Sequence, residues 1–401
     1  MRACFFCLRA DILTDGGNSR WGLILAVWAA GLGAAAQYGK ISVIFGRMGE
    51  LYPQAGTALS FSVSLVGMLG ILLGAVAGPY VAAFGYRRTL VWALGAGAAV
   101  SALQALHLPF GLFLATRVAE GLSHLGIVVA GPVLIAQLSS DRGRGLAMTL
   151  WSTFFAVAFT LLAWFGLPLV RAWGLLALFA AHAAVMAGLA VLLGFALRAV
   201  PVPPRAPLPR LAELPGLHLP IYRSPWIAAP AAGWLFYTCC FVAVLTVIPP
   251  YIADNARGLV LGMMPLASIT VSMTLGVCLL RYVPGVRLAQ LGFLACAAAA
   301  LWLWAVPGAP LACIAMAGAM GLVQGGSFAA VPQLNETTVA RAQASGAMAQ
   351  MGNLGNTIGT PLMVLSLSAA GFGGMMAALL VLFLSGAAVH MLLAARRRGM
   401  V

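Results

Sequence analysis

The sequence predicts an all-α membrane protein whose twelve transmembrane helices form two pseudo-symmetric six-helix bundles. The amino-acid composition predicts that the protein lies in a membrane. Hydrophobic residues make up 62% of the 401 residues and charged residues only 7%, far more apolar surface than a soluble domain of this length needs. Twelve separate apolar runs predict the helix count, and motifs that recur in both halves of the chain indicate the two bundles.

The apolar runs are about 20 residues long or longer, which is the length that an α-helix needs to cross the hydrocarbon core of a bilayer. Six runs precede a break in the pattern and six follow it, and each run is interpreted as one membrane helix. The predicted spans are 21–46, 58–84, 89–107, 109–138, 144–170, 173–197, 226–252, 256–280, 287–306, 309–331, 343–369 and 372–395.

The break is residues 199–225, which are rich in proline and carry four charged residues. Such a composition predicts an extended linker on the cytoplasmic side rather than a membrane helix. We therefore expect an N-terminal bundle in residues 1–198, a linker in 199–225 and a C-terminal bundle in 226–401. The start of the chain has no signal-peptide core, so we expect it to remain as a cytoplasmic tail.

The positions of the basic residues predict the orientation in the membrane. With both termini placed in the cytoplasm, 17 of the 22 lysine and arginine residues fall on the cytoplasmic side. Only Arg47, Arg171 and Arg257 fall on the opposite side, while Lys40 and Arg117 lie within spans. Membrane proteins concentrate lysine and arginine in their cytoplasmic loops. The distribution therefore predicts a multi-pass protein of the cytoplasmic (inner) membrane with both termini in the cytoplasm.

Three short motifs recur about 200 residues apart, in the same order and at the same place in each half. Such a repeat indicates an internal duplication and hence two related bundles. Two related bundles with a substrate site between them, near the middle of the membrane, are typical of transporters that rock between two openings. The matched motifs are Gly85-Tyr86-Arg87 with Gly285-Val286-Arg287, Ala136-Gln137-Leu138 with Pro332-Gln333-Leu334, and Ala147-Met148 with Ala347-Met348.

Glu120 is the one acidic residue, out of eight, that lies inside a long apolar run. Arg117 precedes it by three residues and His124 follows it by four, so all three share one face of the predicted helix. A charged residue within a membrane is costly and marks a functional site by default. We hypothesise that Glu120 exchanges a proton, that an anionic substrate competes for Arg117, and that His124 passes the proton on.

Structural alternatives for these three residues stay open at this point. Arg117 and Glu120 can instead form a permanent ion pair that holds the helix in register without taking part in transport. His124 can be a packing histidine whose hydrogen bonds are satisfied, which is the commoner role of a lone histidine.

Other polar residues in the spans are candidates for lining a substrate cavity. Lys40 is the only lysine of the chain, and it follows Gln37 and Tyr38 in the first span. Its ammonium either extends to the membrane surface near Arg47 or supplies a cation beside the cavity for an anionic substrate. Asparagine and glutamine side chains that faced lipid would lack hydrogen-bond partners, so we expect them inside the bundles. The remaining cavity candidates are Tyr237, Gln324, Gln350, Asn353 and Asn356.

Two motifs resemble those of the major facilitator superfamily, and the resemblance extends over essentially the whole chain. After the second span that family has Gly-x-x-x-Asp-Arg-x-Gly-x-Arg-Arg/Lys, and Gly78, Gly85, Arg87 and Arg88 occupy the matching places here. Two alanines replace the Asp-Arg pair, which in the family belongs to a charge relay between the halves. In the fourth span, residues 117–121 resemble the family's Arg-x-x-Gln-Gly, with Glu120 in place of the Gln.

The resemblance implies the fold of that superfamily and secondary active transport by alternating access, with the glycines and arginines after the second span as a conformational loop. Together with Glu120, it favours a proton-coupled transporter of a small solute such as an organic anion. A proton-antiporting drug or metabolite exporter stays open, as does a non-transporting assembly factor or sensor of the same fold. The expected partners are a small-molecule substrate, protons and the lipid bilayer, and the expected state is a monomer.

The same residues disfavour other classes of function. The spans contain no paired carboxylates or paired histidines, so we expect neither enzyme activity nor a metal site. The seven cysteines form no metal-binding pattern and no nucleotide-binding loop occurs, so no cofactor is expected. The net charge of +14 does not indicate nucleic-acid binding, because the basic residues flank apolar runs and form no patch with interleaved aromatic residues.

Overall fold

The computed structural model describes residues 19–74, 77–140, 142–200 and 221–400, and this part of the chain is helical without a β-strand. The first 18 residues of the predicted tail and residues 201–220 of the predicted linker lie outside the described residues. In the described part, ten helices are long and apolar enough to cross a membrane. The all-α membrane fold predicted from the sequence is confirmed.

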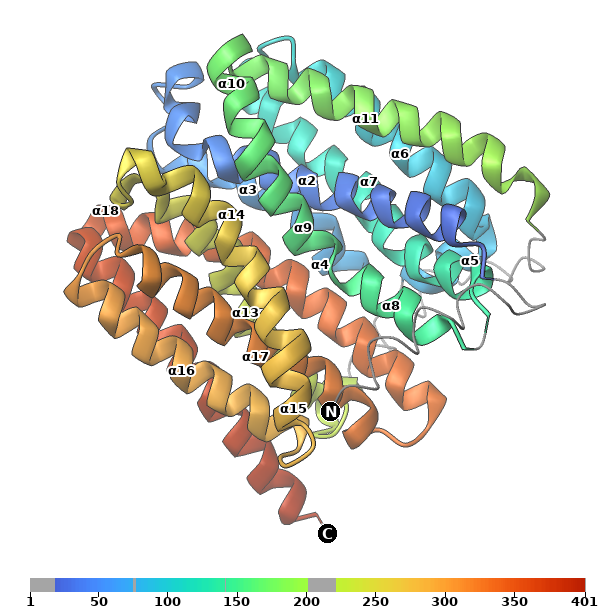
Figure 1. The fold of residues 1–401 in the computed structure, drawn as a ribbon, viewed down its shortest axis with the longest axis vertical. Coiled ribbons are helices and arrows are strands. Elements are labelled where there is room, and N and C mark those ends of the chain that lie inside the picture. Colours follow the sequence, from blue (N-terminus) through green and yellow to red (C-terminus); the bar gives the residue numbers. More distant parts are fainter. Residues whose placement is uncertain (1–18, 75–76, 141, 201–220, 401) are drawn as a thin grey trace, which may run out of the picture.

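The helices before residue 200 form the N-terminal half, coloured blue to green in Figure 1. Gly85 and Gly174 have φ angles of +99° and +85°, which glycine adopts without a Cβ clash, and each lets the chain turn sharply between two helices. The elements are α2 (Trp21–Leu51), η2 (Gly56–Ser60), α3 (Phe61–Ser64), η3 (Leu65–Gly67), α4 (Met68–Leu73), α5 (Ala77–Phe84), α6 (Tyr86–Gln104), α7 (Phe110–Leu138), α8 (Arg144–Ser152), α9 (Phe154–Leu161), η4 (Leu162–Gly166), α10 (Leu167–Trp173), α11 (Leu175–Ala196) and η5 (Leu197–Ala199).

The helices after residue 227 form the C-terminal half, coloured yellow to red in Figure 1. Pro310 occupies the first turn of its helix, where the missing N–H of proline costs no hydrogen bond. The elements are α13 (Ala228–Val247), η7 (Pro249–Tyr251), α14 (Asp254–Val271), η8 (Ser272–Gly276), α15 (Val277–Leu279), α16 (Gly285–Ala305), α17 (Pro310–Leu334) and α18 (Thr338–Arg398).

The ten apolar helices are compatible with the twelve predicted spans for two reasons. First, α6 is not among the ten; it has 19 residues and opens with the charged Arg87 and Arg88. Second, α18 contains two spans, because Ala370 and Gly371 leave helical geometry in its middle. This break falls between the predicted spans 343–369 and 372–395. Within the second predicted span, Gly56–Leu73 is one apolar helix that alternates between 3₁₀ and α geometry, and α5 lies in the rest of the span.

The ends of the helices divide the arginines between two sides of the molecule. Arg87, Arg88, Arg144, Arg287 and the C-terminal arginines 396–398 lie where a helix begins or ends, and alternation of the helices places all of them at one side, here called the basic end. Arg47, Arg171 and Arg257 lie at the ends of helices on the opposite side. Among these ten arginines of the described part, the segregation that the sequence predicted is therefore present.

Three sets of helices join the two halves. α2 packs on α13, α9 and η4 pack on α14, and α18 packs on η2, α3 and α4 (Figure 1). Hydrogen bonds cross the boundary in each set. Ser42 Oγ lies 2.7 Å from Thr246 Oγ1, Thr160 Oγ1 donates to the Gly262 carbonyl at 3.0 Å, and Gln350 Nε2 donates to the Ile71 carbonyl at 2.7 Å.

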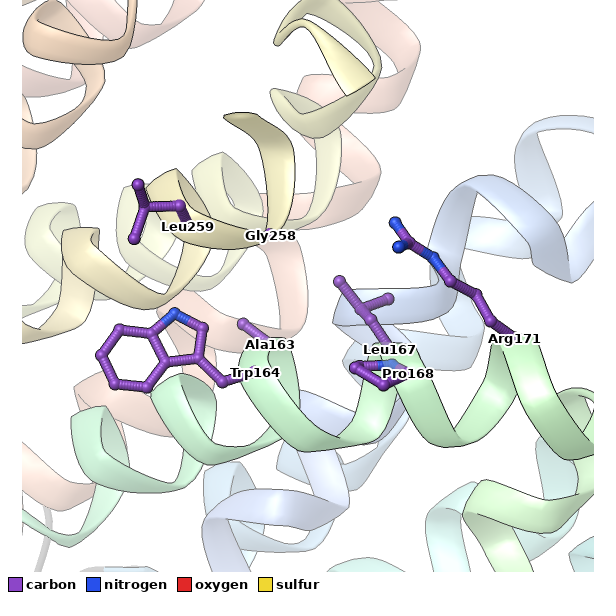
Figure 2. A pocket seen from close by; sticks show the side chains of 7 residues that line it. All are labelled: Ala163, Trp164, Leu167, Pro168, Arg171, Gly258 and Leu259. Carbon is purple, nitrogen blue, oxygen red and sulfur yellow. The ribbon is translucent and has the colours of Figure 1, made fainter. Parts of the chain in front are cut away.

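A groove of about 380 Å³ lies on the boundary between η4–α10 and the start of α14 (Figure 2). Its lining is apolar except for the guanidinium of Arg171 and the indole of Trp164. None of the site residues predicted from the sequence lines it. The lining residues are Ala163, Trp164, Leu167, Pro168, Arg171, Gly258 and Leu259.

Candidate functional site

The Glu120 carboxylate is the centre of a buried polar network inside the N-terminal half. α7 places Arg117 one turn before Glu120, and Arg117 Nη1 donates to Glu120 Oε2. Gln104 on α6 donates to the same oxygen at 3.1 Å. The side chains of Arg117 and Glu120 are both 0% exposed, so this pair is fully removed from solvent and lipid. The sequence-based pairing of Arg117 with Glu120 is therefore present in the structure.

Lys40 on α2 is the second cation of the network, and it lies 80 residues away from Glu120 in the sequence. Its Nζ donates to Glu120 Oε1 at 2.6 Å, to Ser101 Oγ at 2.7 Å and to Gln104 Oε1 at 2.8 Å. An ammonium has three N–H groups, so these three acceptors satisfy it completely. Lys40 is 0% exposed and does not extend to the membrane surface, which makes that alternative for its side chain wrong.

Ser101 and His182 extend the network from α6 to α11. Ser101 Oγ lies 2.7 Å from His182 Nδ1, and His182 Nε2 lies 3.0 Å from the Gly33 carbonyl. A carbonyl only accepts, so Nε2 carries the proton and Nδ1 of the neutral ring is an acceptor. Ser101 therefore donates to His182 and accepts from Lys40.

Arg117 also ties the network to the backbone of two further elements. Its Nε donates to the Ser62 carbonyl at 2.6 Å, and its Nη2 donates to the Gln37 carbonyl at 2.5 Å. Every edge of the guanidinium thus has an acceptor, two of them neutral. Because α2 supplies both Lys40 and the Gln37 carbonyl, the position of α2 depends on the network at two points.

The charges of this network do not cancel. Lys40 and Arg117 are two cations, Glu120 is one carboxylate, and His182 is neutral in the hydrogen-bonded arrangement above. The remaining acidic residues of the described part, Glu50, Asp254 and Glu336, lie at or between helix ends, outside the network. The network therefore carries one net positive charge in a fully buried site, where ionic groups are costly unless they are compensated.

The structure places His124 beside this network rather than in it. His124 Nδ1 lies 3.0 Å from the Ala34 carbonyl, and its ring packs edge-on against Tyr38 with centroids 5.2 Å apart. Gln37, one turn before Lys40, donates at 2.9 Å to Ser123 Oγ, one turn after Glu120. Tyr38 is fully buried, and its hydroxyl has no hydrogen-bond partner in the described part of the chain. The geometry of His124 fits the packing alternative.

The cavity candidates of the C-terminal half do not join the Glu120 network. Tyr237 donates to Gln324 at 3.3 Å, between α13 and α17. Gln350 links the halves, because its Nε2 donates to the Ile71 carbonyl and its Oε1 accepts from Tyr222 at 2.6 Å. Asn353 donates to the carbonyl one turn earlier in α18, and Asn356 is half-buried on the same helix.

The residues of the predicted conformational loop lie together at the basic end. Gly78 is in α5, Gly85 forms the turn between α5 and α6, and Arg87 and Arg88 open α6. In the other half, Gly285 opens α16, and its backbone N–H donates to Gln333 Oε1 at 2.7 Å. The two matched motifs thus occupy equivalent positions at the starts of α6 and α16.

Ser101, Gln104 and His182 were missed by the sequence analysis, although each is a hydrogen-bonding member of the network. Each is a polar residue within an apolar span, and none belongs to one of the motifs singled out in the sequence. A usable signal was present for Gln104 and His182, whose side chains would lack hydrogen-bond partners in lipid and so had to face polar partners inside the bundle, whereas a serine can bond to its own helix backbone. What the sequence does not state is which partner.

Comparison of the sequence with known families complements this geometry. Residues 23–360 match the family described as the Major Facilitator Superfamily. The chain belongs to the major facilitator superfamily. Proteins of this superfamily are membrane transporters, and the resemblance deduced from the motifs of the second loop and the fourth span is confirmed. No curated protein sequence matches the chain.

Solved structures share the major facilitator fold of this chain. A bacterial homologue of the human lysosomal transporter Spinster, in an inward-facing and occupied conformation, superposes with a TM-score of 0.72 and 14% identity over 94% of this chain and 97% of that one. A D-xylose–proton symporter gives a TM-score of 0.72 and 16% identity, with the same coverage of both chains. Identities this low establish the fold and leave the substrate open.

Proposed function

We propose that this major facilitator protein is a proton-coupled secondary transporter that moves a small organic anion by alternating access. The observation that carries the proposal is the uncompensated positive charge of the buried Lys40–Arg117–Glu120 network. Two changes can cancel that charge: an anion entering nearby, or a proton leaving. A site of this kind links the two, because either change alters the cost of the other.

The number of charges in the network supports a role in binding an anion or a proton, in addition to holding helices together. A structural ion pair needs one cation per carboxylate, whereas Glu120 has two cations within hydrogen-bond distance. Buried groups of like charge raise the free energy of the site unless a further anion is present. A D-xylose–proton symporter shares the fold at 16% identity, so proton coupling occurs in a protein with this fold.

The distribution of arginines supports an orientation for the transporter. We place the basic end, and with it both termini, in the cytoplasm, and the protein in the cytoplasmic membrane as a monomer. Alkaline phosphatase fused after Val401 would then be inactive, because that enzyme folds only outside the cytoplasm. An active fusion would show that the C-terminus lies outside the cytoplasm, opposite to the proposed orientation.

The experiment that tests the function begins with the solute. Purified protein is screened against a library of metabolites by thermal shift, since a ligand that binds the folded state raises the unfolding temperature by mass action. We expect the hits to be anionic, and we expect Arg117→Gln and Lys40→Gln to weaken their effect. If all hits are neutral or cationic, and both variants respond to them as the parent does, the proposal of an anionic solute is wrong.

The strongest hit is then tested in proteoliposomes with an imposed pH gradient. We expect the parent protein to accumulate the solute in response to the gradient and Glu120→Gln to lose this response, because its network no longer contains a carboxylate. Glu50→Gln, which changes an exposed carboxylate near the end of α2 and outside the network, serves as the matched control. Full accumulation by Glu120→Gln would show that coupling does not depend on this network.

A further inference from the structure

The hydrogen bonds of the network distinguish between its two candidate proton carriers, Glu120 and Lys40. Protonating Glu120 would leave two unpaired cations and raise the buried charge from one to two. Deprotonating Lys40 would instead leave the Arg117–Glu120 pair, whose charges cancel. Because the cost of a buried charge increases steeply with its size, the exchange at Lys40 is the cheaper of the two.

The groups around Lys40 favour the same choice. The titratable and charged groups that face it are Glu120 and Arg117 on α7 and His182 on α11, while α6 contributes the neutral Ser101 and Gln104. Protonating His182 would place a third cation against Lys40, and its Nε2–H is already donated to a carbonyl. Arginine keeps its proton in proteins, whereas a buried lysine can lose one.

Ser101 is placed to serve both protonation states of Lys40. Beside the ammonium, its oxygen accepts from Nζ and its hydroxyl hydrogen is donated to His182 Nδ1. Beside a neutral amine, rotation of the same hydroxyl directs its hydrogen to the lone pair of Nζ. The two hydrogens of the amine keep the acceptors Gln104 Oε1 and Glu120 Oε1. Neither state leaves the nitrogen without partners.

α2 connects this exchange to the boundary between the halves. Half a turn beyond Lys40, Ser42 bonds to Thr246 on α13, and one turn before it, the Gln37 carbonyl accepts from Arg117. A change in the charge at Lys40 therefore acts on a helix that also holds the opposite half. This is the physical requirement for coupling a proton to a rocking motion.

We propose that Lys40, and not Glu120, is the residue that releases and takes up the coupled proton, with Ser101 as a positioning residue; this rests on the proposed function. On release, one Nζ–H bond breaks, its electron pair stays on the nitrogen, and the proton passes to water when the cycle opens the site. On uptake, the lone pair of the amine accepts a proton. Glu120 stays ionised throughout and serves as the fixed counter-charge.

The chain offers a direct test because Lys40 is its only lysine. Full-length protein labelled with ¹⁵N at the lysine side chain has a single Nζ resonance, which differs between ammonium and amine. In lipid nanodiscs we expect this resonance to change from the ammonium to the amine position as the pH is raised, within the range where the protein remains folded. We also expect the infrared spectrum to contain no band of a protonated Glu120 carboxyl, which would be identified as a protonated-carboxyl band present in the parent and absent in Glu120→Gln.

Two outcomes of this titration would overturn the inference. One is an Nζ resonance that stays at the ammonium position over the whole range. The other is a protonated-carboxyl band that appears on acidification and is missing in Glu120→Gln. Neither measurement requires a solute. Both therefore identify the group that titrates even if the protein does not transport.

Ser101→Ala tests the positioning role in the same titration. Without the hydroxyl, the ammonium can direct its third hydrogen to His182 Nδ1, which lies 3.4 Å from Nζ, but the amine loses the donor to its lone pair. We therefore expect the transition of Nζ to move to higher pH, while Ser123→Ala, which leaves the Lys40 shell intact, should not move it. An unchanged transition in Ser101→Ala would remove Ser101 from the proposal.

Lys40→Arg separates the two candidate carriers in transport. Arginine keeps the positive charge but not the ability to release it, so we expect this variant to lose the accumulation of solute that is driven by pH. If Lys40→Arg still accumulates the solute, Glu120 rather than Lys40 carries the coupled proton. That result would overturn the inference, while the transporter would still be proton-coupled. A parent protein that ignores the pH gradient would instead reject the proposed function.

Discussion

At the scale of the residue, the members of the network are not equivalent, although all three are buried ions. Removing Lys40 or Arg117 leaves one cation and one carboxylate, whereas removing Glu120 leaves two cations and no anion. Breaking a buried pair by deleting one partner is destabilising because it leaves the other charge uncompensated. The loss of Glu120 should therefore cost clearly more stability than the loss of either cation, because only the loss of Glu120 leaves buried cations without an anion.

We predict that Glu120→Gln loses more folding free energy than Lys40→Gln. The loss expected for Glu120→Gln is roughly 3–5 kcal/mol, as for other broken buried pairs. Lys40→Gln should lose less, because Arg117 and Glu120 remain paired. Unfolding in a mild detergent measures both, and Glu50→Gln is the matched control, since its pair with Arg47 is exposed and should contribute nothing measurable. If Lys40→Gln were the more damaging change, the charge argument would be wrong.

How much of this site the sequence predicts can also be judged residue by residue. Arg117 and Glu120 were predicted as a pair because they are three residues apart on one helix, where periodicity determines proximity. Lys40 was singled out, but its contact with Glu120 was not predicted, since it depends on how α2 packs on α7. His182 gave no signal beyond being polar in an apolar span. Local spacing is encoded in the chain, whereas contacts between helices are not.

At the scale of the element, the lengths of the apolar runs predict the helices well, because a bilayer sets a minimum length. The predicted span 109–138 became α7, Phe110–Leu138, and 287–306 became α16, Gly285–Ala305. The second span is less regular, since Gly56–Leu73 alternates between 3₁₀ and α geometry, and this alternation leaves no trace in hydropathy. Hydropathy reports burial in lipid and is insensitive to local departures from helical geometry.

The break inside α18 leads to a prediction about two glycines. Gly371 has a φ of +62° and a ψ of −160°, a region that is open to glycine and strained for other residues, while Gly373 is regular helix. A Cβ at Gly371 would meet nothing within 4 Å, so any effect of Gly371→Ala comes from the backbone alone. We expect it to destabilise the fold by about 1–3 kcal/mol.

Gly373→Ala is the matched control for that change, two residues away in the same element. Its Cβ would make an ordinary contact with Trp304 at 3.7 Å, and alanine favours a helix over glycine by about 0.5–1 kcal/mol. We therefore expect Gly373→Ala to be neutral or slightly stabilising in the same unfolding measurement. Equal stabilities for the two variants would mean that the chain does not keep the break at Gly371.

At the scale of the whole molecule, the hydrogen bonds between the halves identify what must move. Ser42 with Thr246 and Thr160 with Gly262 lie on helices that belong to different halves. In a rocking transporter each half moves largely as a rigid body, so bonds within a half persist while bonds across the boundary are broken and remade. The two classes of bond can be distinguished by covalent locking.

We predict that a disulfide across the boundary stops transport and a disulfide within a half does not. The hydroxyls of Ser42 and Thr246 are 2.7 Å apart, and those of Ser19 and Ser140, both in the N-terminal half, are 2.9 Å apart. In a background without the seven native cysteines, Ser42→Cys/Thr246→Cys should therefore oxidise and lose uptake of the solute found in the screen, with recovery on reduction. Ser19→Cys/Ser140→Cys should oxidise equally well and keep uptake. Undiminished uptake with the boundary disulfide in place would show that α2 and α13 stay together throughout the cycle, and that the halves separate elsewhere.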